Sequence, residues 1–121
     1  MRYMLLCYDD GPAWERLGET AHQAAIEEAV RLTHELHDKG QYILASPLEA
    51  TSTAKSVRVR DGKPLITDGP FAETREHLGG FYLIEADSQD EALAIAARHP
   101  GARLGTVEVR PLLEISGLPG E

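Results

Sequence analysis

Residues 79–86 read GGFYLIEA, and this short stretch decides the fold. In an extended chain Phe81 and Leu83 point to one side and their neighbours to the other, because side chains alternate along a strand. A strand that is apolar on both sides is typical of the middle of a sheet. Residues 2–8, RYMLLCY, have the same character and end at the turn signal of residues 9–12, DDGP. They predict a second central strand.

Two helices are expected between the strands. The first begins at Thr20, because Thr20 and Gln23 have the spacing of a capping box, and it ends at Gly40. The second begins with the capping box Ser88-x-x-Glu91 and stops at residues 100–101, Pro-Gly. The side chains predicted to face the core are His22, Ile26, Ala29, Val30, Thr33, Leu36 and His37 in the first helix, and Ala92, Leu93, Ala96 and Ala97 in the second.

The remaining strands complete a familiar order of elements. Residues 41–46 predict a strand, residues 55–60 and 64–67 a hairpin around Asp61-Gly62, and residues 106–112 a last strand. Strand, helix, strand, inserted hairpin, strand, helix, strand is the ferredoxin-like split βαβ order of an α+β domain. We therefore expect one domain over residues 1–112, with two helices on one face of an antiparallel sheet, and a flexible tail over residues 113–121.

Two helices can cover only one face of such a sheet. The other face would expose either Tyr82 and Ile84 or Phe81 and Leu83, since the sequence leaves open which pair meets the helices. A soluble monomer seldom leaves so large an apolar patch in water. We expect a homodimer that pairs sheet against sheet. The alternative is a monomer whose hairpin, residues 55–67, folds over the open face.

The composition excludes several classes of function. The chain has 121 residues and a formal charge of −8, which repels nucleic-acid phosphates, so direct nucleic-acid binding is not expected. No apolar run is long enough for a membrane span, and a cytoplasmic location is expected. The single cysteine, Cys7, lies in an apolar strand and predicts a buried, inert thiol.

Cofactor and metal sites are not expected either. Nucleotide-binding motifs such as GxGxxG or a P-loop are missing from the sequence. The run His34-Glu35-Leu36-His37 places two histidines on one helix face, yet it is not HExxH, and no further ligand group completes a site. His22 and His99 are predicted at helix ends, where a capping or surface role suffices.

Several segments together resemble a known family. These are YMLLCYDD near the start, TDGPFAET at residues 67–74, LGGFY at residues 78–82, and VEVRPL near the end. The chain resembles the DGPF-domain branch of the YciI-related (YCII) family over nearly its whole length. The resemblance implies a ferredoxin-like fold that assembles as a dimeric α+β barrel. Most members of that family are uncharacterised.

The resemblance also implies candidate activities and partners. Some relatives are dehydrochlorinases of chlorinated hydroxyquinones that use a His and Asp pair, and Ala29 stands here where their helix-one His is expected. Some DGPF-branch proteins accompany extracytoplasmic-function sigma factors, which implies such a partner.

The candidate catalytic residues are Asp68 and His77. His77 titrates near neutrality and precedes a central strand, so it is the best acid–base candidate. A hydrogen bond donated by the His77 ring to the Asp68 carboxylate would favour the imidazolium and fix the tautomer. The alternatives are that Asp68 caps the turn and that His77 lies in a solvated segment.

The candidate ligand-binding residues are Gly69, Pro70, Phe71 and Trp14. Gly69 is suited to a positive φ, and Phe71 is expected as a core anchor under the loop or as a pocket wall. Trp14 is expected as a ligand wall, an interface anchor or a core residue. Three functions remain open: an enzyme of proton-transfer chemistry on a small acid or phenol in a cleft by residues 68–77, a non-catalytic binding or regulatory dimer, and a dimer whose loop is architectural.

Overall fold

The computed structural model describes residues 1–72 and 74–120. The helices and strands, in chain order, are β1 (Arg2–Asp9), α1 (Glu19–Asp38), β2 (Tyr42–Pro47), β3 (Lys55–Arg60), β4 (Lys63–Asp68), β5 (His77–Glu85), α2 (Gln89–Arg98), α3 (Gly101–Leu104) and β6 (Thr106–Pro111). Two short 3₁₀ turns, Glu15–Leu17 and Thr51–Thr53, precede α1 and β3.

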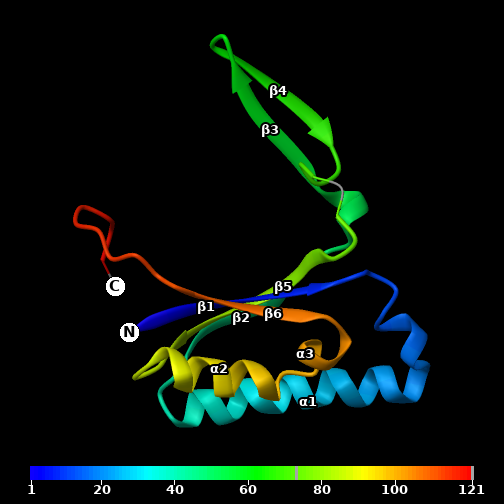
Figure 1. Cartoon of the computed structure of the whole chain (residues 1–121), viewed down its shortest axis with the longest axis vertical. Coiled ribbons are helices and arrows are strands. Elements are labelled where there is room, and N and C mark those ends of the chain that lie inside the picture. The colour runs from blue at the N-terminus through cyan, green and yellow to red at the C-terminus, as the bar shows by residue number, and fades with distance from the viewer. Residues whose placement is uncertain (73, 121) are drawn as a thin grey trace.

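The main sheet has four antiparallel strands in the order β2-β5-β1-β6. The helices α1 and α2 lie together on one side of it (Figure 1). This is the split βαβ arrangement that the order of elements predicts, and the α+β fold class is confirmed. The two strands that are apolar on both faces, β1 and β5, occupy the centre as expected.

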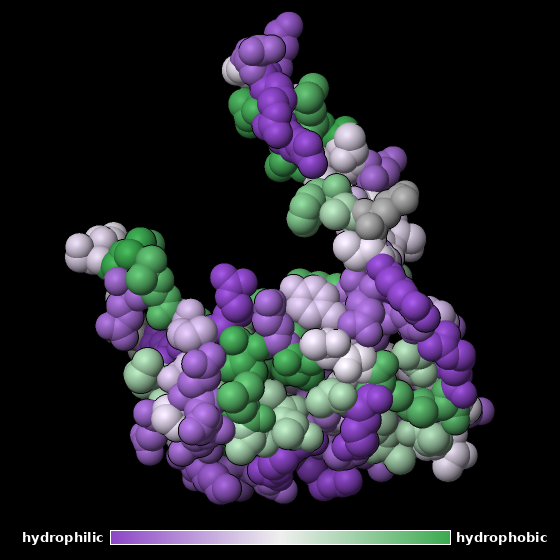
Figure 2. Space-filling model, in the orientation of Figure 1, coloured by the Kyte–Doolittle hydropathy of each residue, from purple (hydrophilic) through white to green (hydrophobic). Residues whose placement is uncertain are grey.

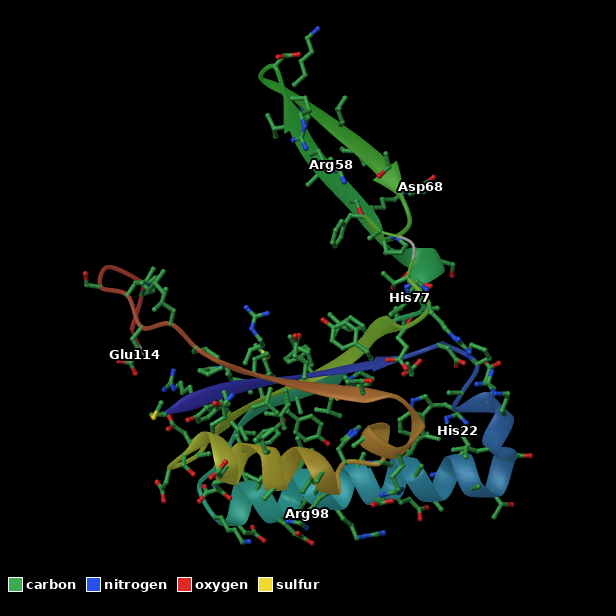
Figure 3. All side chains as sticks on the ribbon, in the orientation of Figure 1. His22, Arg58, Asp68, His77, Arg98 and Glu114 are labelled. Atoms are coloured by element: carbon green, nitrogen blue, oxygen red, sulfur yellow. The ribbon has the colours of Figure 1, made fainter. Side chains whose placement is uncertain are left out.

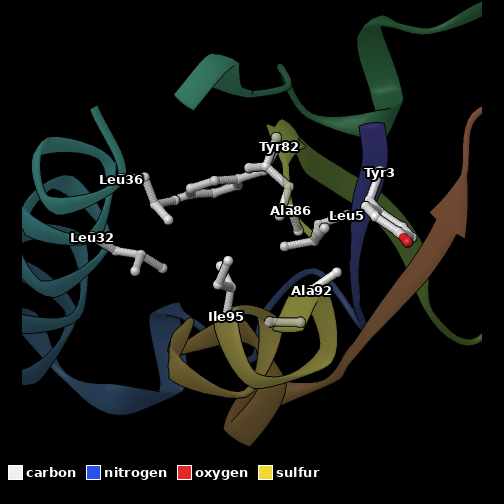
Figure 4. Close-up of a cluster of buried hydrophobic side chains, with 10 residues drawn as sticks. Tyr3, Leu5, Leu32, Leu36, Tyr82, Ala86, Ala92 and Ile95 are labelled. Atoms are coloured by element: carbon white, nitrogen blue, oxygen red, sulfur yellow. The ribbon is translucent and has the colours of Figure 1, made fainter. Parts of the chain in front are cut away.

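The core lies between the sheet and the helices. Tyr3 and Leu5 of β1 and Tyr82 and Ile84 of β5 point toward the helices and are buried. Figure 4 shows side chains of α1 and α2, among them Leu36, closing over Tyr82 and Leu5. Burial of each large apolar side chain contributes about 1.5–3 kcal/mol relative to exposure. The structure thereby decides which pair of β5 side chains meets the helices.

The opposite side of the sheet is not covered by any part of the chain that the structure describes. We call this surface the open face and define it by five apolar side chains: Met4, Leu6, Leu44, Phe81 and Leu83. Met4 lies opposite Leu83 and Leu6 opposite Phe81 in the β1–β5 register, and Leu44 of β2 lies on the other side of Leu83. Half of the Leu44 side chain is exposed, at 51%. The open face is therefore a continuous apolar surface across three strands.

The inserted hairpin forms a separate two-stranded sheet, with β3 paired to β4. It projects away from the main sheet, on the side opposite the helices (Figure 1). The alternative in which the hairpin folds over its own open face is therefore wrong for the single chain. Both strands are edge strands, which explains why Pro64 is tolerated in β4.

The first helix differs from its prediction in two ways. It begins at Glu19 after Gly18, whose φ is +85°, and no side chain caps it, so the predicted capping box at Thr20 is wrong. Its buried residues are Ala25, Leu32 and Leu36, whereas three predicted core residues, Ile26, Val30 and His37, are exposed. The buried stripe of the helix is therefore narrower than the predicted one.

The second helix follows its prediction at the start. The Ser88 Oγ accepts a hydrogen bond from the Glu91 backbone N–H at 3.1 Å, and the Glu91 carboxylate accepts one from the Asp87 N–H at 3.3 Å. The buried side chains are Ala92, Ile95 and Ala96, but Leu93 and Ala97 are exposed, contrary to prediction. The helix ends at Arg98, and a short helix, α3, leads into β6.

Gly105 lies where the chain turns from α3 into β6. A substitution there tests how closely this turn packs against β1. An added Cβ would lie 2.1 Å from the Tyr8 carbonyl oxygen of β1, which cannot move without breaking the sheet. We expect Gly105→Ala to lower the free energy of unfolding by about 1–3 kcal/mol, the usual effect of overpacking. Chemical denaturation measures it. Gly120→Ala is the matched control, because an added Cβ there meets no atom within 4 Å. An equal stability of the two variants would contradict the close approach.

Candidate functional site

The two predicted catalytic residues lie apart in the single chain. Asp68 ends β4 on the hairpin and accepts a hydrogen bond from Lys55 Nζ at 2.6 Å, with both side chains largely exposed. His77 begins β5 at the base of the hairpin, and Figure 3 shows the two side chains well separated. The expected hydrogen bond between them is therefore not formed within one copy. A catalytic role for either residue remains a prediction.

The loop after Asp68 continues the hairpin. Gly69 adopts the predicted positive φ, +85°, and its N–H donates to the Ala54 carbonyl at 2.7 Å. The Ser56 hydroxyl donates to the Gly69 carbonyl at 2.9 Å. Phe71 is 77% exposed, so the prediction that it anchors the loop in the core is wrong for the single chain. The loop has a defined conformational role, and it leaves Phe71 and Pro70 in water.

The carboxylate nearest to His77 in the sheet register belongs to Asp9. The last residue of β1, Asp9, lies directly opposite His77 after an irregularity between Cys7 and Tyr8. Side chains that face each other across antiparallel strands have Cβ atoms about 4.5–5.5 Å apart. The His77 Nδ1 also lies 3.5 Å from the Thr74 hydroxyl. Sequence reasoning treated Asp9 only as part of a turn, because strand register is invisible in the sequence.

Asp9 is held firmly in this position. Its Oδ1 accepts a hydrogen bond from the Gly11 N–H at 2.7 Å, and its Oδ2 accepts one from the Trp14 indole Nε1 at 3.1 Å. The carboxylate lies over Gly79, where an added Cβ would be 3.1 Å from Oδ2. The irregularity in the β1–β5 register adds Gly79 to β5 at this point, so the alternation of side chains along β5 is interrupted there. Along the regular strand β1, Asp9 falls on the same side as Leu5 and Cys7, which is the side of the helices.

Further polar side chains surround this end of the sheet. Asp10 accepts a hydrogen bond from Arg16 at 2.7 Å, and this bond is the main reason that its pKa lies below the ordinary value. The Thr106 hydroxyl of β6 donates to Glu76 at 3.0 Å. Among the described residues, the Asp10 Oδ1 is the one buried side-chain oxygen or nitrogen that lacks a hydrogen-bond partner. We call Asp9, Trp14 and His77 the strand-end site.

An aromatic cluster supports the strand-end site from the helix side. The His99 ring lies 5.2 Å from the Tyr82 ring and 6.5 Å from the Trp14 ring, between centroids. His99 is the C-cap residue of α2 and its ring accepts from the Gly101 N–H, so the predicted capping role is confirmed, but the ring is buried and not at the surface. Cys7 is buried as predicted, and burial raises the pKa of its thiol to about 11.

His99 is neutral in this setting. Its Nδ1 accepts a hydrogen bond from the Gly101 N–H at 2.9 Å, so the ring proton is on Nε2. Burial holds the pKa of His99 below its ordinary value of 6.5. If Nδ1 were protonated, its N–H would point at the Gly101 N–H, and two buried donors would lack an acceptor.

Among the described residues, one cleft of about 550 Å³ lies between the ends of α1 and α2 near Gln41 and Glu91, and another of about 230 Å³ lies among charged side chains such as Glu28 and Arg103. Neither of these borders the strand-end site or the residues Asp68, Phe71 and His77. Within residues 1–72 and 74–120, no group of three His, Cys, Asp or Glu side chains is placed to hold a metal ion. None of the described helices is both long and apolar enough to cross a bilayer.

Chemically, the strand-end site combines a histidine with a fixed carboxylate at the end of two central strands. A neutral imidazole can accept a proton, and a neighbouring carboxylate stabilises an imidazolium. The indole beside the carboxylate is suited to contact the flat, partly apolar body of a small ligand.

The buried His99 predicts how stability depends on pH. The unfolded chain takes up a proton near pH 6.5 whereas the folded chain does so only at lower pH, so stability is lost as pH falls below about 6.5. The loss is at most about 1.4 kcal/mol per pH unit. In His99→Asn the side-chain oxygen can still accept from Gly101 but does not titrate, so this loss should disappear. Urea unfolding between about pH 5 and pH 8 measures both proteins, and identical pH profiles would contradict the assignment.

The comparisons with known proteins agree with this fold. The YCII-related domain model matches residues 1–116. An uncharacterised protein of Rhizobium meliloti (strain 1021) is 34% identical over 114 residues, covering 93% of this chain and 92% of the relative.

A solved structure is similar throughout. It is the 5-chloro-2-hydroxyhydroquinone dehydrochlorinase of Burkholderia phenoliruptrix in complex with 2,5-dihydroxybenzoquinone, with a TM-score of 0.53 and 14% identity over 93% of this chain and 94% of that one. At this identity the similarity shows a shared fold. The family match extends over nearly the whole chain, and the protein therefore belongs to the YCII-related domain family.

Proposed function

We propose that the protein is a homodimeric enzyme that performs proton-transfer chemistry on a small, partly apolar acid or phenol. The observation that carries the proposal is the placement of His77 opposite Asp9 at one end of the central strand pair β1 and β5. Isomerisation, lyase action and dehydrochlorination all begin with removal of a proton, which a histidine near neutrality can accept.

The dimer is proposed because the open face needs a cover. Met4, Leu6, Phe81 and Leu83 form a central apolar surface that the helices do not reach. A second copy placed on it by a two-fold axis would bury the same side chains of both copies.

In the proposed mechanism His77 accepts a proton from a hydroxyl or carbon of the substrate. Asp9 orients the ring and stabilises the imidazolium, while Trp14 keeps Asp9 in place through the indole hydrogen bond. The proton is then returned to another atom in an isomerisation. In a dehydrochlorination it stays on His77 as chloride leaves. The solved neighbour that carries a quinone ligand supports this class of substrate.

A non-catalytic dimer that binds a metabolite or a sigma factor is the second candidate. It is favoured by the exposure of Phe71, 77%, on the loop that ends the hairpin. An exposed aromatic side chain on an ordered loop is a common contact for a protein partner.

The dimer is tested by sedimentation equilibrium at micromolar concentration. We expect a mass of twice 13.2 kDa for the natural chain. Leu83→Asp should raise the dissociation constant at least tenfold, because burial of one Leu side chain is worth about 1.5–3 kcal/mol. The matched control is Leu93→Asp, which adds the same charge on the exposed side of α2. A natural chain that stays monomeric would contradict the proposal.

The chemistry is tested with 2,5-dihydroxybenzoquinone as a binding probe and chlorinated hydroquinones as substrates. We expect His77→Ala to lower turnover by about 10²–10⁴-fold, the usual worth of a general base, with probe affinity little changed by calorimetry. The matched control, His34→Ala, removes an exposed histidine of α1 and should leave turnover unchanged.

Two further outcomes separate the candidate functions. Asp68→Asn would lower turnover as strongly as His77→Ala only if Asp68 reaches a site in the dimer. Binding of the probe without turnover of any substrate would favour the non-catalytic dimer, and turnover that survives in His77→Ala would contradict the enzyme proposal.

A further inference from the structure

The hairpin of β3 and β4, residues 55–68, is the feature that a single chain does not explain. We call it the arm. An isolated two-stranded hairpin is at best marginally stable in water and needs packing against another surface. The arm extends away from its own body, and β3 and β4 pair chiefly with each other (Figure 1).

One face of the arm is apolar. Side chains opposite each other in an antiparallel pair lie on the same face. Val57 lies opposite Ile66, and Val59 lies opposite Pro64. Val57 is 65% exposed and Ile66 is 69% exposed. Figure 2 shows hydrophobic side chains, in green, along the hairpin far from the core.

The other face of the arm is basic. Arg58 lies opposite Leu65, and Arg60 lies opposite Lys63. Residues 55–68 hold four basic and two acidic side chains, whereas the rest of the chain holds eight basic and eighteen acidic side chains. A net charge of +2 on the arm thus opposes −10 on the rest of the chain, which we call the body. Opposite charges steer association and favour one partner over another.

We propose that the apolar face of each arm packs on the body of a second copy, so that the dimer exchanges arms. This inference rests on the dimer of the proposed function. The arm rises on the same side of the sheet as the open face, which is the side that the second copy would occupy (Figure 1). The body of that copy is acidic and therefore complementary to the arm.

The exchanged arm accounts for two observations together. It removes exposed apolar side chains from water, and it supplies the tertiary contact that a lone hairpin needs. The charge difference favours a second copy because every copy carries both the basic arm and the acidic body. By two-fold symmetry the contact would be made twice in each dimer.

The test compares two substitutions that add the same charge to opposite faces of one hairpin. Val57→Asp alters the apolar face, and Leu65→Asp, the matched control, alters the basic face. Both side chains are more than half exposed in the single chain, so neither change should unfold the body. We expect Val57→Asp to raise the dimer dissociation constant about tenfold or more, and Leu65→Asp to raise it much less.

Amide hydrogen exchange of the arm gives an independent measurement. The backbone amides of the arm should be protected in the natural dimer and should lose protection in Val57→Asp and on dilution to monomer. If Leu83→Asp weakens the dimer but Val57→Asp and Leu65→Asp change its dissociation constant equally, the arm exchange is contradicted and the proposed dimer stands. If the arm amides are unprotected in the dimer, the arm exchange is likewise contradicted, and the arm has a different partner. A monomeric natural chain would overturn both.

Discussion

The pairing of β1 with β5 is the constraint on which the rest of the structure depends. Both strands are apolar on both faces, and they lie at the centre of the sheet. One face is closed by α1 and α2, because Tyr82 and Ile84 pack with Leu36 and the other core residues. The other face, with Phe81 and Leu83, has no such cover among the described residues. The uncovered face of this strand pair is therefore the basis of the proposed assembly.

The same strand pair brings two titratable side chains together at one of its ends. Antiparallel register sets the last residue of β1 against the first of β5, so that Asp9 meets His77 although 68 positions separate them in the chain. Trp14 and Gly11 hold the carboxylate of Asp9, and Gly79 leaves room for it. The fold that holds this pair of side chains is shared with a dehydrochlorinase, while 14% identity transfers no residue role.

The distribution of charge adds a further level of organisation. The body is strongly acidic and the arm is basic, so that one chain carries two complementary surfaces that are too far apart to meet within it. The aspartate and glycine of the DGPF segment lie at the base of the arm, where Asp68 pairs with Lys55 and Gly69 bonds to Ala54. These contacts give that segment a clear conformational role, that of closing the hairpin. Phe71, the last residue of the segment, is exposed.

The sequence alone determined the order of elements, the central strands, the hairpin and the capping box at Ser88, because these depend on local patterns and turn chemistry. It did not determine which side chains of α1 are buried, because an apolar arc that includes Ile26 and Val30 is wider than the contact with the sheet. The sequence suggested Asp68, which is nearby in the chain, as the partner of His77, whereas the strand register places Asp9 opposite His77. Only the tertiary structure decides register, the direction of the arm and the burial of His99, since each depends on contacts between residues far apart in the chain.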